Sequence, residues 1–236
     1  MSQPIFKVSL MKHFTRRLLA VTAMTFVTAS AYAADLVAPS PSVEAAPVVA
    51  HSPWQLRLRA LGVLPDNKGF VDQIPGSDLS FSKTITPELD ITYYFTDNLA
   101  AELILGTTYS NVNGEGTIAG LGKLGKTWIL PPTLTLQYHF TDFGAFKPYI
   151  GAGVNYTIFY NQDAAGAIDR LKVKNSWGAA LQVGFDYMLD DHWGVNFDVK
   201  KLFLEPKFEA DVAGGTVTGK AKLNPWLIGA GVTYRF

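Results

Sequence analysis

Apolar and polar residues alternate with a period of two along much of the chain after residue 53, which is the pattern of a half-buried β-strand. Eight segments show this alternation, and each has about the length that a tilted strand needs to cross a bilayer. They are residues 54–60, 88–95, 99–106, 133–140, 150–158, 176–187, 193–200 and 226–236. Their apolar phase contains no Asp, Glu, Lys or Arg, although 17% of the chain is charged. The pattern therefore predicts an antiparallel all-β fold with one strongly apolar face.

The same alternation would also fit a soluble sandwich or a lipocalin-like barrel with its apolar face inward. The connections between the segments favour a membrane barrel instead. Short turns are expected at 96–98, 141–147 and 189–192. Long segments that are rich in Gly or charge alternate with them, at 64–84, 110–127, 161–173 and 202–222. Short periplasmic turns and long outer loops are typical of outer-membrane barrels.

Aromatic residues gather near the short turns and the two ends of this region, as in the girdle at one bilayer interface. They are Trp54, Tyr93, Phe95, Tyr138, Phe140, Phe185, Tyr187, Trp193, Tyr234 and Phe236. Candidates for the opposite girdle are Tyr109, Trp128, Tyr156, Trp177 and Trp226. We therefore expect an eight-stranded antiparallel transmembrane β-barrel of the outer-membrane type. Tyr234 and Phe236 end its last strand with aromatic residues, as expected of a signal to the outer-membrane assembly machinery.

The first 33 residues have the organisation of a secretory signal peptide. Lys12, Arg16 and Arg17 precede an apolar run at 18–27, and Ala31-Tyr32-Ala33 provides a cleavage site. An N-terminal membrane anchor is the alternative, but the run is short and contains threonines. Residues 34–53 are rich in Pro and Ala and are expected to be a flexible N-terminal segment before the barrel at 54–236.

Composition narrows the choice of function. The chain of 236 residues has a mean hydropathy of +0.12 and no Cys, which excludes a disulfide framework, thiolate zinc sites and thiol catalysis. Removal of residues 1–33 takes away four basic residues and no acidic ones, which changes the net charge from zero to −4. A nucleic-acid partner is therefore not expected.

Charged residues of both signs occupy the polar phase of the predicted strands. They are Arg57, Arg59, Glu88, Asp90, Glu102, Asp186, Asp198 and Lys200. Further hydrogen-bonding groups in this phase are Gln55, Gln137, His139, Gln182 and Asn196. An eight-stranded barrel has an interior just wide enough for side chains, so these residues are expected to form a paired polar network that plugs the lumen. A conducting polar lumen is the less favoured alternative.

Several segments of this region resemble the OmpW family of small outer-membrane proteins. They are Leu130–Phe140 (LPPTLTLQYHF), Phe146–Thr157 (FKPYIGAGVNYT), Asn175–Ala180 (NSWGAA), Leu223–Trp226 (LNPW), and Asp97-Asn98 with Glu102. The resemblance covers essentially all of 54–236. It implies an eight-stranded barrel in the outer membrane, surrounded by its lipid, that helps small hydrophobic molecules to cross.

Family members are thought to have an apolar constriction, and Ile104 is a candidate for it because this residue points inward. Lys200 also points inward and argues against a continuous apolar tunnel. A route that leaves sideways through the barrel wall avoids this charge. Pro131 and Pro132 are candidates for such a lateral gap, because proline donates no hydrogen bond to a β-ladder. The alternative is that they only mark the start of a strand.

Apolar residues in the predicted long loops would either line an access funnel or pack the loops together. They are Leu64, Phe70, Val71, Ile74, Leu79, Phe81, Ile118, Leu121 and Leu124. The Gly-rich run 114–125 lacks the βαβ context of a phosphate-binding loop. No nucleophile–base set or metal-ligand spacing is present, so we expect neither an enzyme nor a cofactor. The sequence thus predicts passive passage of hydrophobic molecules; the alternative is a plugged barrel whose loops serve adhesion or envelope integrity.

Overall fold

The computed structural model describes residues 52–236. The predicted signal peptide at 1–33 and almost all of the predicted N-terminal segment at 34–53 lie outside the described residues. The described part of the chain consists of strands β1 to β15 and one 3-10 helix, η1 (Ala119–Leu121). Within it, no helix is long and apolar enough to cross a membrane.

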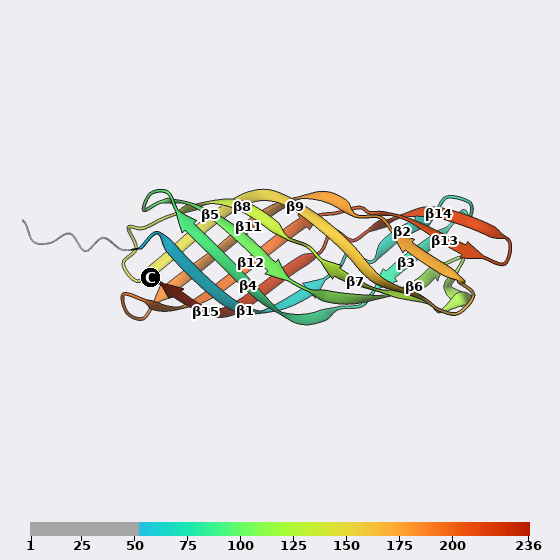
Figure 1. Cartoon of the computed structure of the whole chain (residues 1–236), viewed down its shortest axis with the longest axis horizontal. Coiled ribbons are helices and arrows are strands. Elements are labelled where there is room, and N and C mark those ends of the chain that lie inside the picture. The colour runs from blue at the N-terminus through green and yellow to red at the C-terminus, as the bar shows by residue number, and fades with distance from the viewer. Residues whose placement is uncertain (1–51) are drawn as a thin grey trace, which may run out of the picture. The chain divides into compact units, whose positions relative to one another are not determined.

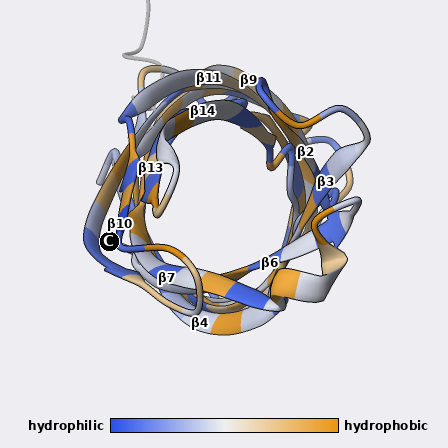
Figure 2. Ribbon diagram, turned by 90° about the vertical axis from the view of Figure 1, so that its right-hand side faces the viewer, coloured by the Kyte–Doolittle hydropathy of each residue, from blue (hydrophilic) through white to orange (hydrophobic). Residues whose placement is uncertain are grey.

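Eight strands form a closed antiparallel barrel, which confirms the predicted fold (Figures 1 and 2). They are β1 (Trp54–Leu64), β4 (Thr84–Tyr94), β5 (Leu99–Gly106), β8 (Thr133–His139), β9 (Phe146–Ala164), β11 (Ser176–Met188), β12 (Trp193–Phe203) and β15 (Trp226–Arg235). Each of the eight predicted segments overlaps one of these strands. The ring closes because β1 pairs with both β15 and β4, and β9 pairs with both β8 and β11.

The alternation along each strand separates the two faces of the barrel wall. Leu58 and Leu136 point outward and are 57% and 55% exposed, whereas Arg57 and Asp90 point inward and are fully buried. This arrangement is the inverse of a soluble barrel and fits a wall surrounded by lipid. Rings from neighbouring strands also contact one another near the short turns, for example Trp54 and Tyr93 with centroids 4.9 Å apart. The outer wall therefore has the apolar band and the aromatic girdle that the sequence predicts.

Short turns join the strands at one end of the barrel, which we call the turn end. In the turn between β11 and β12, Asp190 Oδ1 accepts hydrogen bonds from the backbone N–H groups of Trp193 and His192 at 2.7 and 2.8 Å. These bonds favour the carboxylate and hold the pKa of Asp190 below its ordinary value. The exposed side chain thus fixes the short turn that the sequence predicts at 189–192.

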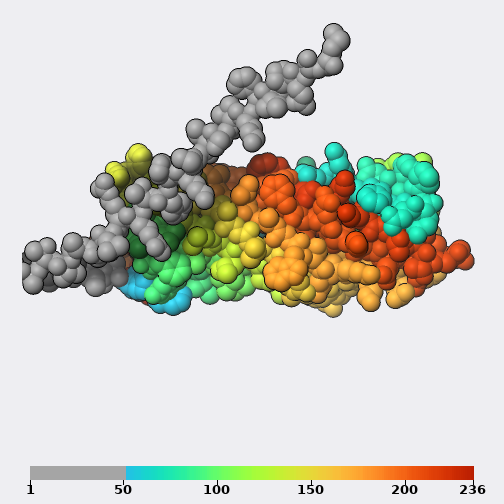
Figure 3. Space-filling view, turned by 90° about the horizontal axis from the view of Figure 1, so that it is seen from above, coloured from blue at the N-terminus to red at the C-terminus, as the bar shows by residue number. Residues whose placement is uncertain are grey.

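The opposite end of the barrel differs from the prediction. The four long segments predicted as loops contain much of a further β-structure, which we call the extension (Figure 1). The strands β7 (Lys123–Leu130), β6 (Thr108–Gly116) and β3 (Ser77–Phe81) follow one another beside the far part of β9. A separate four-stranded sheet has the order β10 (Arg170–Val173), β13 (Lys207–Val212), β14 (Gly215–Lys222) and β2 (Lys68–Val71). Figure 3 shows segments from both halves of the chain meeting at this end.

The extension has its own hydrophobic core. Its buried members are Val71, Leu79, Phe81, Val112, Ile118, Leu124, Phe159, Leu171, Val173, Leu204, Phe208, Ala210, Ala221 and Leu223. Most of the apolar residues assigned to loops therefore pack together, and several of them belong to strands, which corrects the loop assignment. Three of them are exceptions: Leu64 lies in the barrel strand β1, and Phe70 and Leu121 remain 39% and 43% exposed. The extension is thus a packed structure rather than a set of separate loops.

Candidate functional site

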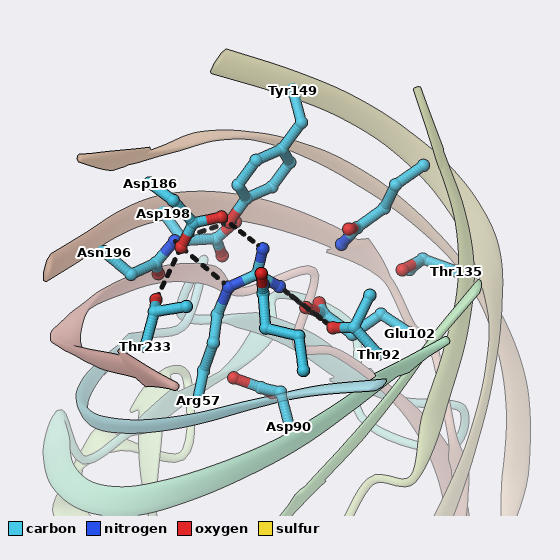
Figure 4. A network of polar contacts seen from close by, with 12 residues as sticks. Arg57, Asp90, Thr92, Glu102, Thr135, Tyr149, Asp186, Asn196, Asp198 and Thr233 are labelled. Carbon is cyan, nitrogen blue, oxygen red and sulfur yellow. Dashed lines mark hydrogen bonds and ion pairs between the residues drawn. The ribbon is translucent and has the colours of Figure 1, made fainter. Parts of the chain in front are cut away.

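Arg57 lies at the centre of the polar network inside the barrel (Figure 4). Its Nη2 atom lies 2.5 Å from Asp186 Oδ2, and its Nε atom donates to Asp186 Oδ1 at 3.0 Å. Its Nη1 atom forms an ion pair with Glu102 and donates to Thr92 Oγ1 at 3.2 Å. One arginine of β1 therefore ties together β4, β5 and β11.

Arg59 and Lys200 carry the network toward the extension. Arg59 Nη2 lies 2.5 Å from Asp90 Oδ2 and 2.9 Å from Glu88 Oε1. Lys200 Nζ lies 2.8 Å from Asp198 Oδ1 and 3.0 Å from Glu88 Oε1. The structure thus brings together all eight charged residues that the alternation assigns to the lumen, and each is at most 2% exposed.

Tyr149 and Thr233 also belong to the network, although neither is among the lumen residues that the sequence predicts. Tyr149 Oη donates to Asp198 Oδ2 at 2.9 Å, and Thr233 Oγ1 donates to Asp186 Oδ1 at 2.6 Å. The fifth predicted segment begins at residue 150, and Tyr149 is the next position of its inward phase. Thr233 stood in the polar phase, but a single small hydroxyl carries no signal that distinguishes it from other threonines.

An amide joins the charged residues to one another, and rings extend the network to the turn end. Gln182 Nε2 donates to Glu102 Oε1 at 2.9 Å and to Asp198 Oδ2 at 2.8 Å. The ring of His139 lies between those of Tyr94 and Tyr149, with centroids 5.0 and 4.9 Å away. These buried side chains fill the half of the lumen nearest the turn end, where hydrogen bonds and ion pairs hold them in place.

Toward the extension, the inward-facing residues change from charged to apolar. Leu61 follows Arg59 on β1, Leu202 follows Lys200 on β12, and both are buried in one cluster with Leu227 of β15. Leu61 and Leu202 lie just beyond the predicted segments 54–60 and 193–200, so the alternation did not assign these two leucines to the lumen. Ile104 of β5 joins the same region and is 4% exposed.

These side chains surround an apolar cavity of about 70 Å³, which we call the chamber. Glu88 and Lys200 border it on the side of the turn end, so the polar network closes the chamber there. Leu204 and Leu223 border it on the side of the extension and also belong to the extension's core. A second cavity of about 80 Å³ lies within the extension. It is lined by residues of that core and by Ile74, Leu121, Ile168, Val212 and Val217.

The barrel wall beside the chamber contains an interruption of the β-ladder, which we call the seam. The β5–β8 ladder ends at Ile104 opposite Thr133, and the β6–β7 ladder begins at Thr108 opposite Ile129. Both ladders have the same register, so 105–107 lie opposite 130–132, and in the described structure no ladder pair joins these two stretches. Pro131 and Pro132 stand in this interval.

The carbonyl groups of the two prolines accept hydrogen bonds from β9 and not from the strand across the seam. The carbonyl of Pro132 accepts from the backbone N–H of Tyr156 on β9 at 3.1 Å, and Asn155 Nδ2 donates to the carbonyl of Pro131 at 3.1 Å. Pro131 and Gly106, which face each other across the seam, both line the chamber. The strand β8 begins at Thr133, so the prolines both precede a strand and border a gap in pairing.

Comparison with known proteins agrees with this architecture. The model of the OmpW family matches residues 53–236. An uncharacterised outer-membrane protein of Sinorhizobium fredii, y4mB, is 58% identical over 93% of this chain and 96% of its own length. Outer membrane protein W of Vibrio cholerae is 32% identical over 83% of this chain and 94% of its own.

Among solved structures, the outer membrane protein OprG of Pseudomonas aeruginosa superposes with a TM-score of 0.72. It is 29% identical in sequence, and the match covers 79% of this chain and 97% of OprG. The resemblance noted in the sequence is thus confirmed by sequence and by structure. The closed eight-stranded barrel, its lipid-facing wall and these matches show that the chain belongs to the OmpW family of outer-membrane proteins.

Proposed function

We propose that the barrel gives small hydrophobic molecules a passive route from the cell surface into the outer membrane, with a lateral exit through the barrel wall at the seam. In outer-membrane barrels the short turns face the periplasm. The chamber and the extension then belong to the outer half of the protein. The proposal rests on one observation: the chamber borders the polar network on one side and the seam on another.

The polar network supports a route that avoids the inner half of the lumen. A hydrophobic solute would have to displace Arg57 from Glu102 and Asp186 in order to pass straight through. Breaking a buried ion pair costs about 3–5 kcal/mol, and an apolar solute offers the freed charges no hydrogen bonds in return. Straight passage is therefore unfavourable.

The apolar side chains above the network support access from outside. Leu204 and Leu223 border the chamber and belong to the extension's core, other members of which line the second cavity. A solute would pass from one cavity to the other where side chains of this core move apart. The surface that the two cavities expose is mostly apolar, which favours apolar molecules over sugars or ions.

The seam supports an exit into the membrane. Elsewhere in a closed barrel, neighbouring strands are held together by ladder hydrogen bonds that a solute would have to break. At Pro131 and Pro132 the chain cannot supply backbone donors, so strands β5 and β8 can separate locally at lower cost. Gly106 on the opposite side has no side chain to obstruct the opening.

A barrel that serves adhesion or envelope integrity is the second candidate function. The packed core of the extension favours it, because this core gives the surface-exposed part a stable shape. The two candidates differ in what happens to a hydrophobic solute when the protein is present.

The test is uptake of naphthalene by bacterial cells with and without the protein, alongside the variant that carries Pro131→Val and Pro132→Val together. We expect faster uptake with the protein and a loss of most of that gain in the variant. Pro148→Val is the matched control, since Pro148 lies in β9 at the turn end, away from the seam, and should leave uptake unchanged. Equal uptake by cells with and without the protein would favour the structural barrel. Full uptake through a folded double variant would reject the lateral exit.

A further inference from the structure

The four-stranded sheet of the extension has one apolar and one charged face. Leu171, Phe208, Ala210 and Ala221 point into the extension's core. The residues between them point outward and include Lys68, Lys172, Lys174, Lys207, Lys220 and Lys222. The outward face therefore combines strands from three different parts of the chain into one basic surface.

The register of the sheet places lysines directly beside one another. Lys207 of β13 is the direct partner of Lys220 on β14. The backbone N–H of Lys174 donates to the carbonyl of Lys207 at 2.8 Å, which sets Lys174 on the other side of Lys207. In the next row, Lys222 is the direct partner of Lys68 on β2. We call these five residues the lysine patch.

Such an arrangement opposes folding unless something neutralises it, because like charges directly opposite each other in a sheet are destabilising. In the rows farther from the barrel, basic residues stand opposite acidic ones, which is the usual favourable arrangement. There Arg170 stands opposite Asp211, and Lys172 stands opposite Glu209. The contrast within one sheet indicates that the lysines near the barrel are placed together for a purpose other than stability.

Acidic side chains compensate the patch only in part. Lys174 Nζ lies 2.5 Å from Glu209, a pair that lowers the pKa of this carboxyl, and Lys220 Nζ lies 3.7 Å from Glu205. Both pairs are largely exposed and therefore weak. Asp72 lies at the rim and accepts a hydrogen bond from Thr218. Three carboxylates thus face five ammonium groups, which leaves a positive surface.

A hollow of about 340 Å³ lies on this surface. Lys174, Lys207 and Lys220 line it together with Phe70 and Thr218. Asp72, Phe208, Glu209 and Gly219 complete the lining. A phosphate group on a sugar would find three ammonium groups within one concavity, offset in part by the carboxylates of Asp72 and Glu209, with the exposed ring of Phe70 beside them.

The position of the lysine patch relative to the bilayer interface indicates which kind of molecule it meets. Lys174 is followed three residues later by Trp177, and Lys222 is followed four residues later by Trp226. These tryptophans are 70% and 48% exposed on the lipid-facing wall, as expected at a bilayer interface. The lysine patch therefore stands just outside the apolar band, at the level of lipid headgroups.

We propose that the lysine patch binds the phosphate groups of a phosphorylated glycolipid of the outer leaflet, the lipopolysaccharide that forms this surface of the outer membrane. The binding would fix the extension against the headgroup layer. It is independent of the solute route, because none of the five lysines borders the chamber or the seam.

The test uses the full chain, refolded in phosphatidylcholine bilayer discs and titrated with bisphosphorylated lipid A. The variant Lys207→Gln with Lys220→Gln should weaken binding about thirtyfold, because each lysine near an anionic lipid surface contributes on the order of 1 kcal/mol and two are removed. The matched control, Lys123→Gln with Lys147→Gln, changes the charge equally but lies away from the patch and should bind normally. Lys207→Arg with Lys220→Arg keeps the charge and should also bind normally.

Three further ligands separate the sources of the phosphate chemistry. Dephosphorylated lipid A, phosphatidylglycerol and inorganic phosphate should each bind at least tenfold more weakly than bisphosphorylated lipid A. Equal binding of dephosphorylated lipid A would overturn the role of the phosphates. Equal binding of phosphatidylglycerol or inorganic phosphate would overturn the assignment to a glycolipid. Wild-type affinity in a folded Lys207→Gln, Lys220→Gln variant would overturn the assignment to this patch.

Discussion

Arg57 shows how far single residues of the lumen follow from the sequence. Its inward position follows from alternation with Leu56 and Leu58. Its partner Asp186 does not, because β11 is not a neighbour of β1 and meets it only across the closed lumen. The pairing depends on the tilt and stagger with which the barrel closes, and no local pattern encodes these.

Removal of the Arg57 side-chain charge should strongly destabilise the barrel. Arg57→Leu leaves Glu102 and Asp186 buried without their cation, and such a change costs about 3–5 kcal/mol. The measurement is the free energy of unfolding in urea, followed by tryptophan fluorescence in detergent. Arg170→Gln, which removes the exposed pair with Asp211, is the control and should leave the midpoint unchanged. Equal midpoints for both variants would contradict the assignment of a structural network.

The strands of the extension illustrate what alternation misses at the scale of elements. The strand β10 has only four residues, Arg170–Val173. In the same sheet, β13 and β14 are separated only by the turn Ala213-Gly214. Such short runs carry too little periodicity to be distinguished from loops. Their stability comes from non-local pairing of segments that lie far apart in sequence, such as β2 with β14. The barrel strands are long and strictly alternating, which is why all eight were predictable.

Phe208→Ala should loosen the extension without opening the barrel. Phe208 is 7% exposed in the extension's core, and truncation of a buried Phe costs about 3–5 kcal/mol locally. Limited proteolysis should therefore cut the extension faster, while the barrel keeps the electrophoretic mobility of its folded form. Phe70→Ala is the matched control, since Phe70 lies in the same sheet but is 39% exposed. If both variants were cut at the same rate, Phe208 would not be part of a stabilising core.

The whole molecule combines two environments within one ring of strands. Charged pairs fill the lumen toward the turn end, and apolar side chains line it toward the extension. The sequence contains both sets in one inward phase, but the boundary between Arg59 and Leu61 becomes visible only when the strands are aligned in register. Because of this boundary, the lumen is plugged only toward the turn end, and the apolar part beyond it is a candidate route to the seam.

The most direct test of this route closes the seam reversibly. The chain has no Cys, so Thr107→Cys with Leu130→Cys introduces one pair across the seam, where the register sets these positions opposite each other, and it keeps both prolines. Leu103→Cys with Leu134→Cys, at direct partners in the β5–β8 ladder, is the control. Naphthalene uptake is measured in cells before and after oxidation and again after reduction. We predict that the disulfide at the seam lowers uptake and that reduction restores it, while the control pair has no effect. Unchanged uptake with the seam fully cross-linked would contradict the account.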